Sequence, residues 1–182
     1  MAQSFDTVGW FARDPVILNR VGRILLQLPD VDLVRPRQIF IAEDCFQLLS
    51  TPNNRVSQVI VKSVEKLFGG DVVKHLILGD YVENKVPSLS HFISKEIKKQ
   101  DYGIASLAAL SSAMRLLQRY EFKNNDGEWV TTVKPDLGTG ISERVWEAIQ
   151  TTGEIIDICY SVKAEINATL TSLLEYQDDS AR

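Results

Sequence analysis

The sequence predicts an α/β fold in which helices pack on a few strands of a mixed sheet. Two short apolar runs, at residues 38–42 and 72–78, are separated by an amphipathic helical pattern, as in a βαβ unit. Beyond residue 104, apolar residues recur at helical spacing. With 45% hydrophobic and 24% charged residues, the chain has the composition of a single globular domain over residues 1–182.

The first helix has a strong start signal. Asp14 offers an N-cap carboxylate, and Pro15 has the backbone angle that the first helical position requires. The Pro-Asp pair at residues 29–30 predicts its end. Its apolar face consists of Ile17, Val21, Ile24 and Leu28, with Leu18 and Leu25 beside them.

A βαβ unit is predicted next. Residues 38–42 are rich in β-branched and aromatic side chains, which is typical of a buried strand. Asn54 is placed to cap a second helix, which the glycine pair at residues 69–70 closes. Residues 72–78 predict a second strand, so the two strands belong to a parallel or mixed sheet. The stripe of the helix between them consists of Val56, Val59, Ile60, Val64 and Leu67.

The second half of the chain predicts helices. The first of them spans residues 104–122, with small residues beside its apolar face. The run Asn-Asn-Asp-Gly at residues 124–127 predicts a turn, and residues 129–135 a loop or a short extended piece. The apolar face consists of Leu107, Leu110, Met114 and Leu117.

Two further signals predict the last helices. Ser142 is placed to cap a helix that follows the glycines of residues 138–140. Thr151 and Glu154 have the spacing of a capping box for a final helix that runs to about Tyr176. Residues 177–182 form a polar tail. The face of the final helix consists of Ile155, Cys159, Val162, Ile166, Leu170 and Leu173.

The charge balance argues against nucleic acid or an anionic membrane surface as the main partner. The net charge is -4, whereas both ligands require a basic face. No apolar run approaches the roughly 18 residues of a membrane span. One basic cluster is interrupted by acidic residues, as expected of a solvated helix face. It consists of Lys95, Lys98 and Lys99, interrupted by Glu96 and Asp101.

The cysteines and histidines predict neither a disulfide scaffold nor a metal site. Cys45 and Cys159 are too few for a scaffold, fit a reducing compartment, and are interpreted as small buried hydrophobic residues. His75 and His91 have no thiol or carboxylate at metal-ligand spacing, so local hydrogen bonding is expected. We therefore predict no metal and no cofactor.

Several motifs resemble those of the amidase-signature hydrolases. The first is Ser-Phe-Asp-Thr-Val-Gly at residues 4–9, followed by Phe-Ala-Arg at residues 11–13. Two plant groups share these motifs: indole-3-acetamide amidohydrolases and the amidase-like preprotein receptor of the chloroplast envelope. The sequences at residues 108–112 and 141–144 favour the amidohydrolases. The resemblance covers nearly the whole chain, through further motifs at residues 61–70, 114–119, 133–135 and 141–144.

The resemblance implies that the catalytic residues lie outside this sequence. The family hydrolyses amides with a serine nucleophile, a second serine in a cis peptide and a lysine base. Its Gly-Gly-Ser-apolar-Arg motif is absent, since Gly70 is followed by Asp71. Ser111 and Ser112 lie in a helical pattern, where a cis bond would cost about 3 kcal/mol, so we assign them to helix packing. We expect a chain that begins after the catalytic serine, has no catalytic residue and is inactive alone.

The resemblance also implies a partial amidase-signature fold with an incomplete core. The large mixed sheet of the family draws strands from sequence on both sides of this stretch. The two predicted strands then have unpaired edges, and the helices have uncovered apolar faces. We expect marginal stability or aggregation of the isolated chain.

Asp6 is the residue to which the resemblance gives a site role. It matches an aspartate near the family's nucleophile loop, where a carboxylate accepts backbone N–H bonds and fixes that loop. An ordinary turn aspartate is an equal alternative. The resemblance also places residues 114–129 over the substrate funnel, with the substrate-binding residues unassigned.

Three functions remain open at this point. One is an amidohydrolase, which converts a small carboxamide such as indole-3-acetamide to an acid and ammonia. Another is a non-catalytic interaction module like the chloroplast import receptor. The last is a regulatory fragment that associates with a full-length amidase. The first implies a cytoplasmic location, and the second implies the cytosolic face of the chloroplast outer envelope.

Overall fold

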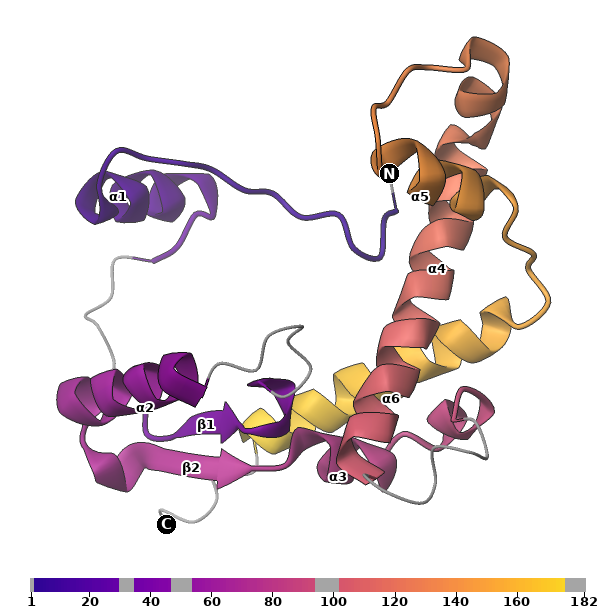
Figure 1. The fold of residues 1–182 in the computed structure, drawn as a ribbon. Helices are drawn as coiled ribbons and strands as arrows, with labels where there is room; N and C mark the ends of the chain where they lie inside the picture. The colour runs from indigo at the N-terminus through magenta and orange to yellow at the C-terminus, as the bar shows by residue number, and fades with distance from the viewer. Residues whose placement is uncertain (1, 30–34, 47–53, 94–101, 176–182) are drawn as a thin grey trace.

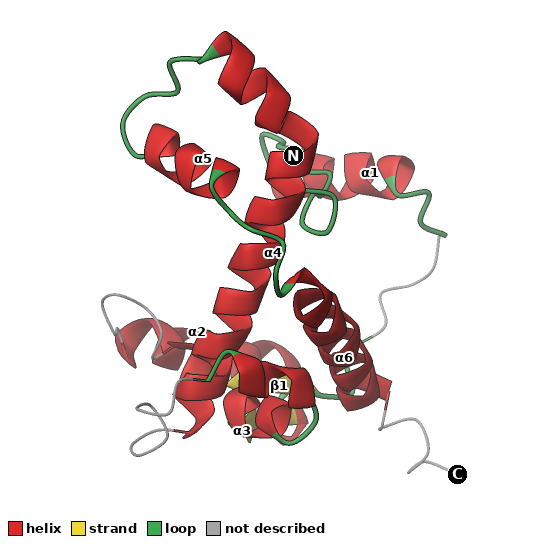
Figure 2. Cartoon of the chain, turned by 90° about the vertical axis from the view of Figure 1, so that its right-hand side faces the viewer, coloured by secondary structure: helices red, strands yellow, loops and turns green. Residues whose placement is uncertain are grey.

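The computed structural model describes residues 2–29, 35–46, 54–93 and 102–175. In these residues six α-helices and a two-stranded parallel sheet, which lies beside α2, confirm the predicted α/β class with an incomplete core (Figure 1, Figure 2). The predicted basic cluster at residues 95–101 and the polar tail at residues 177–182 lie outside the described residues.

Helix α1, Pro15–Leu25, begins as predicted. The Asp14 carboxylate accepts a hydrogen bond from the Ile17 N–H at 2.9 Å, with proline at the first helical position. The helix ends before the predicted residues 29–30, because Gln27 adopts a left-handed φ of 51°. The Leu28 N–H then donates to the Arg23 carbonyl at 3.0 Å, which closes a Schellman motif.

Helix α1 stands apart from the other helices, at the end of a long N-terminal segment (Figure 1). Its packing partner is Trp10, whose indole N–H donates to the Leu18 carbonyl at 3.2 Å. The indole lies directly on Gly22, where an added Cβ would come within 2.5 Å of the ring. This glycine is therefore required by close approach, and a side chain there would displace Trp10.

The predicted βαβ unit is confirmed. Strands β1, Ile39–Ala42, and β2, Val73–Leu76, pair in parallel with Ile39 opposite Val73, and helix α2, Asn54–Phe68, connects them. Gly69 ends α2 with a φ of 98°, a backbone conformation that glycine adopts without steric cost.

The second strand is shorter than predicted, because residues 77–78 lead into a helix. Helix α3, Leu78–Glu83, is capped from a distant segment: the buried carboxylate of Asp44, in the short helix η1, Asp44–Phe46. This carboxylate accepts hydrogen bonds from the N–H groups of Leu78 at 3.0 Å and Gly79 at 2.7 Å. The cap satisfies two N–H groups that a helix start leaves unpaired, so α3 begins directly after the sheet.

Helix α4, Tyr102–Val133, runs 32 residues, so the turn predicted at residues 124–127 and the loop predicted at residues 129–135 are wrong up to Val133. Gly127 is buried in the helix against Ile149 of α5, where an added Cβ would already be in contact at 3.5 Å. Packing of this kind outweighs the roughly 1 kcal/mol that glycine costs in a helix interior. The helix ends at Lys134, which has a φ of 50° and precedes a proline.

The buried face of α4 agrees with the predicted one at Leu107 and Leu117, which are 6% and 1% exposed, but not at every position. Met114, predicted on the apolar face, is 44% exposed. One row of buried positions recurs every four residues, beside further buried residues such as Ser106 and Val130, and three of the five members of the row are alanines, which let neighbouring helices approach closely. They are Ala105, Ala109, Ala113, Leu117 and Glu121.

The last two helices form where predicted, but their predicted caps are wrong. Helix α5, Ile141–Ile149, is capped by Gly140 with a left-handed φ of 82°, and Ser142 lies inside its first turn. Helix α6, Ile156–Glu175, begins after the predicted capping box. The Thr151 hydroxyl instead donates to the Glu147 carbonyl at 3.1 Å and so extends the end of α5.

The core lies where α3, α4 and α6 meet the short helix η3, Pro87–His91. The buried cluster leaves at most 2% of each side chain exposed. Its members are Val82, Val86, Leu89, Ala109, Ala113 and Val162.

Large apolar faces remain exposed, as predicted for an incomplete core. The accessible surface is 13876 Å², against about 8,900 Å² for a compact monomer of this mass. On α1, Ile24 is 75% exposed, and on α2, Leu67 is 67% exposed. Val56 and Val59 extend the exposed stripe of α2.

Because of this stripe, we expect the purified chain to self-associate at micromolar concentrations. Replacing Val59 and Leu67 together with lysine should raise the monomer fraction at 50 μM at least twofold, measured by analytical ultracentrifugation. Gln58→Lys, on an exposed polar position of the same helix, is the control for added charge. A monomeric wild-type chain with a cooperative unfolding transition would contradict the prediction.

Candidate functional site

A groove of about 850 Å³ lies between the N-terminal segment, α4 and α5. This volume is within the range of small-molecule sites, roughly 300–1,000 Å³. Figure 1 shows α5 lying across α4 close to the N-terminus. The groove is lined by Ala2, Phe5, Asp6, Arg115, Gln118, Arg119, Phe122, Gly140, Ile141, Glu143, Arg144, Val145, Glu147 and Ala148.

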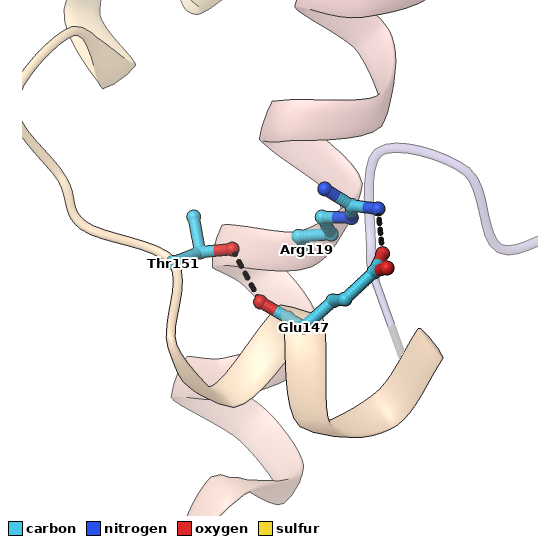
Figure 3. Close-up of polar contacts among 3 residues, drawn as sticks. All are labelled: Arg119, Glu147 and Thr151. Atoms are coloured by element: carbon cyan, nitrogen blue, oxygen red, sulfur yellow. Dashed lines mark hydrogen bonds and ion pairs between the residues drawn. The ribbon is translucent and has the colours of Figure 1, made fainter. Parts of the chain in front are cut away.

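A salt bridge between Arg119 of α4 and Glu147 of α5 fixes one side of the groove (Figure 3). Thr151 bonds to the backbone of Glu147, and the Lys123 ammonium donates to the Thr151 carbonyl at 2.7 Å. These contacts join the end of α5 to α4, so the spacing between the two helices is set by both charge and backbone hydrogen bonds.

The lining has no net charge and is partly apolar. Phe5, Phe122 and Ile141 supply apolar surface. Guanidinium groups donate hydrogen bonds to a carbonyl oxygen, and carboxylates accept them from an N–H₂ group. The lining therefore offers both kinds of partner to a neutral carboxamide attached to an apolar body. The three basic and three acidic groups are Arg115, Arg119 and Arg144, with Asp6, Glu143 and Glu147.

Asp6, the predicted site residue, lies in this groove. A tight turn places it there, since the N–H groups of Phe5 and Asp6 donate to the Ala2 carbonyl at 2.8 and 2.9 Å. Its proposed role in fixing a nucleophile loop stays a prediction, and the turn geometry fits the alternative that the sequence left open.

A contact between Ser4 and Lys163 was not predicted from the sequence. The Lys163 ammonium donates to the Ser4 hydroxyl at 2.7 Å. A lysine activates a serine only when it is desolvated and neutral, whereas Lys163 is exposed. The Ser4 hydroxyl accepts from Lys163 and donates a hydrogen bond to the Glu121 carboxylate, so Ser4 and Lys163 lack the arrangement of a nucleophile and its base.

Ser111 and Ser112 lie in the middle of α4, where the described residues contain no cis peptide bond. Both side chains are exposed, so their assignment to helix packing is wrong. The Ser112 hydroxyl donates to the Ala108 carbonyl at 2.9 Å, a local bond along the helix.

The predicted local hydrogen bonding holds for His91, whereas His75 pairs with a residue 32 positions away. His75 Nδ1 lies 2.6 Å from a carboxylate oxygen of Glu43 at the end of β1, and His91 Nδ1 lies 3.2 Å from the Ser88 carbonyl. Within the described ranges, no cluster of three or more histidine, cysteine, aspartate or glutamate side chains has a metal-binding arrangement.

The cysteines differ in exposure. Cys159 is buried, as predicted, whereas Cys45 is only partly buried. Burial raises the pKa of both thiols, and the negative charge of Asp44 adds to the effect at Cys45. Both changes disfavour the reactive thiolate.

Of the helices in the described part of the chain, none combines the length and the hydrophobicity needed to cross a bilayer. This finding covers the described residues alone.

Comparison with known proteins confirms the resemblance to the amidase family. The chain is 54% identical over 177 residues to a protein named Amidase 1 from Arabidopsis thaliana, and 42% identical over 176 residues to one named Amidase 1 from Oryza sativa subsp. japonica. It is 45% identical over 176 residues to Outer envelope protein 64, chloroplastic, from Arabidopsis thaliana.

Each alignment covers 96% of this chain, but only 42%, 40% and 30% of the respective relatives. The chain therefore spans less than half of each relative's length. No profile of a protein family matches the sequence. No solved structure matches it either.

Proposed function

We propose that this chain, whose relatives include two plant proteins named Amidase 1, is part of an amidase that converts a small carboxamide to an acid and ammonia. The carrying observation is the 54% identity over 177 residues with one of them. In this proposal the chain contributes a wall of the substrate site, and the catalytic serines and lysine lie outside residues 1–182.

The groove supports the proposal through its chemistry. Arg115 and Arg144 are both exposed and line the groove, where their guanidinium groups are placed to reach an amide oxygen. Asp6 lies in the same groove as an acceptor for the amide N–H₂ group. The lining lacks net charge, so it favours a neutral amide over a carboxylate. Indole-3-acetamide, which joins an aromatic ring to a primary amide, matches this combination.

A second candidate is a non-catalytic interaction module. The 45% identity with Outer envelope protein 64 favours it, because that relative's name places it in the chloroplast envelope. This candidate predicts the cytosolic face of the chloroplast outer envelope, whereas the amidase proposal predicts the cytoplasm. Association with a full-length amidase is a further possibility for partners, and neither function calls for a cofactor, nucleic acid or a membrane span.

Titration with indole-3-acetamide, followed by the amide NMR signals of the full chain, tests the proposal. We expect saturable shifts at groove residues, and about tenfold weaker binding for Arg115→Ala, because a hydrogen bond to a charged group is lost. The matched control is Arg20→Ala, since Arg20 is an exposed arginine on α1, outside the groove.

Shifts that are not saturable, or that spare the groove residues, would reject the groove as an amide site and favour the interaction module. A parallel titration with indole-3-acetate shows whether the groove prefers a neutral amide to a carboxylate anion. If this anion binds as tightly as the amide, the argument from the neutral lining is wrong.

A further inference from the structure

A buried carboxylate on α4 holds the N-terminal segment. Glu121 is only 2% exposed, although an ionisable side chain without partners is costly to bury. One of its oxygens accepts the Ser4 N–H at 2.8 Å, and the other accepts the Ser4 hydroxyl. The two contacts join residues 117 positions apart in the sequence.

Two more side chains complete this arrangement. The Tyr160 hydroxyl donates to the Glu121 carboxylate at 3.4 Å, and Lys163 donates to the Ser4 hydroxyl. Desolvation and the negative charge of Glu121 raise the pKa of Tyr160, which keeps its phenol a donor. The Ser4 hydroxyl thus donates one hydrogen bond and accepts another, which uses its donor and one acceptor.

The arrangement involves the sequence neighbours of groove-lining residues. Glu121 precedes Phe122 and Ser4 precedes Phe5 and Asp6, and these three following residues all line the groove. A second bond, from the Asn125 side chain to Gln3 at 2.8 Å, ties the same segment to the next turn of α4. Residues 2–6 therefore form a wall whose position depends on α4.

We propose that Glu121 is a positioning residue, which holds residues 2–6 in place as one wall of the groove. The role of Glu121 in holding residues 2–6 rests only on its hydrogen bonds to Ser4. Its consequence for ligand binding rests on the proposed function, because it requires the groove to be the amide site.

The chain contains a matched control in Glu165. Its two carboxylate oxygens accept the Ser88 N–H at 3.0 Å and the Ser88 hydroxyl at 2.7 Å, the same chemistry at the junction of α6 and η3. Glu165 and Ser88 do not line the groove. A change in Glu165 therefore reports the general cost of losing such a pair of bonds, without releasing residues 2–6.

The test compares Glu121→Gln with Glu165→Gln by amide hydrogen exchange of the full chain, read residue by residue with NMR. Glu121→Gln removes the negative charge that strengthens the two hydrogen bonds to Ser4, so we expect exchange of the Ser4, Phe5 and Asp6 amides to accelerate about tenfold. In Glu165→Gln these amides should keep their rates, while the Ser88 amide accelerates.

Ser4→Ala is the second variant, because it leaves α4 unchanged and removes only the hydroxyl. We expect about threefold faster exchange at Phe5 and Asp6, and this measurement decides the question if Glu121→Gln does not fold. Unchanged exchange at residues 4–6 in the folded variants would overturn the proposal. Equal acceleration in Glu165→Gln would overturn it as well, because the effect would then be general.

Binding of indole-3-acetamide separates this proposal from the proposed function. We expect Glu121→Gln to weaken binding about tenfold and Glu165→Gln to leave it unchanged. If wild type binds no amide while Glu121→Gln still releases residues 2–6, the amide site is wrong and the positioning role stands. If wild type binds the amide and exchange at residues 4–6 is insensitive to Glu121→Gln, the positioning role is wrong and the amide site stands.

Discussion

The purified chain is expected to release no ammonia from indole-3-acetamide or acetamide above the rate in buffer. Amide hydrolysis requires a nucleophile activated by a base or by a lowered pKa. The Ser4 hydroxyl donates a hydrogen bond to the Glu121 carboxylate beside an exposed lysine, and the Ser112 hydroxyl donates one to a helix carbonyl, so neither serine has a neutral, desolvated lysine as its base. An enzyme-coupled ammonia assay, with a full-length amidase as the positive control, measures the difference.

Turnover above the buffer rate would contradict this expectation. Alanine variants would then identify the residues responsible. Loss of that turnover in Ser4→Ala would assign it to the contact with Lys163. Loss in a Ser111→Ala, Ser112→Ala double variant would assign it to the middle of α4 instead. Persistence in both would point to a contaminating amidase.

Replacing Leu89 with alanine is expected to lower the free energy of unfolding by about 2–5 kcal/mol. Leu89 is 1% exposed in the core cluster, where its side chain contacts the helices that hold the fold together. Total stabilities of domains are about 5–15 kcal/mol, and a chain with uncovered apolar faces belongs at the lower end. Urea unfolding followed by circular dichroism should therefore show largely unfolded protein at low denaturant.

Leu67→Ala makes the same chemical change on the surface of α2, where Leu67 is 67% exposed. We expect this control to change stability by about 0.5 kcal/mol or less. Equal effects of the two substitutions would show that the cluster around Leu89 is not the core.

Local sequence patterns were sufficient to predict the elements whose capping residues are close in sequence. They could not predict elements that depend on residues far away in the sequence. Asp14 and Gly69 act within a few residues of their own helix, so their signals were readable. Helix α3 was missed because its cap, Asp44, lies 35 positions from Gly79. The turn expected at residues 124–127 failed for the same reason, since burial against α5 overrides the local preference.

The site was predictable only where a motif marked it. Asp6 was singled out from the first motif and lies in the groove, although its role is untested. No sequence pattern marked the arginines of the groove as site residues, because exposed arginines are common on helices. Glu121 was missed as well, since an isolated glutamate in a helical pattern is normally assigned to solvent, and its partner Ser4 lies 117 positions away in the sequence.

The spacing of the buried row on α4 has a consequence for rigidity. Four residues advance about 400° around a helix, so each member of the row is turned about 40° from the one before it. The row that runs from Ala105 to Glu121 therefore winds around the axis. Elements that pack against successive members of this row therefore contact α4 from different sides. Rotating or sliding α4 would break these contacts together, so the groove, whose lining on α4 begins at Arg115, keeps the register that the core fixes through Ala109 and Ala113.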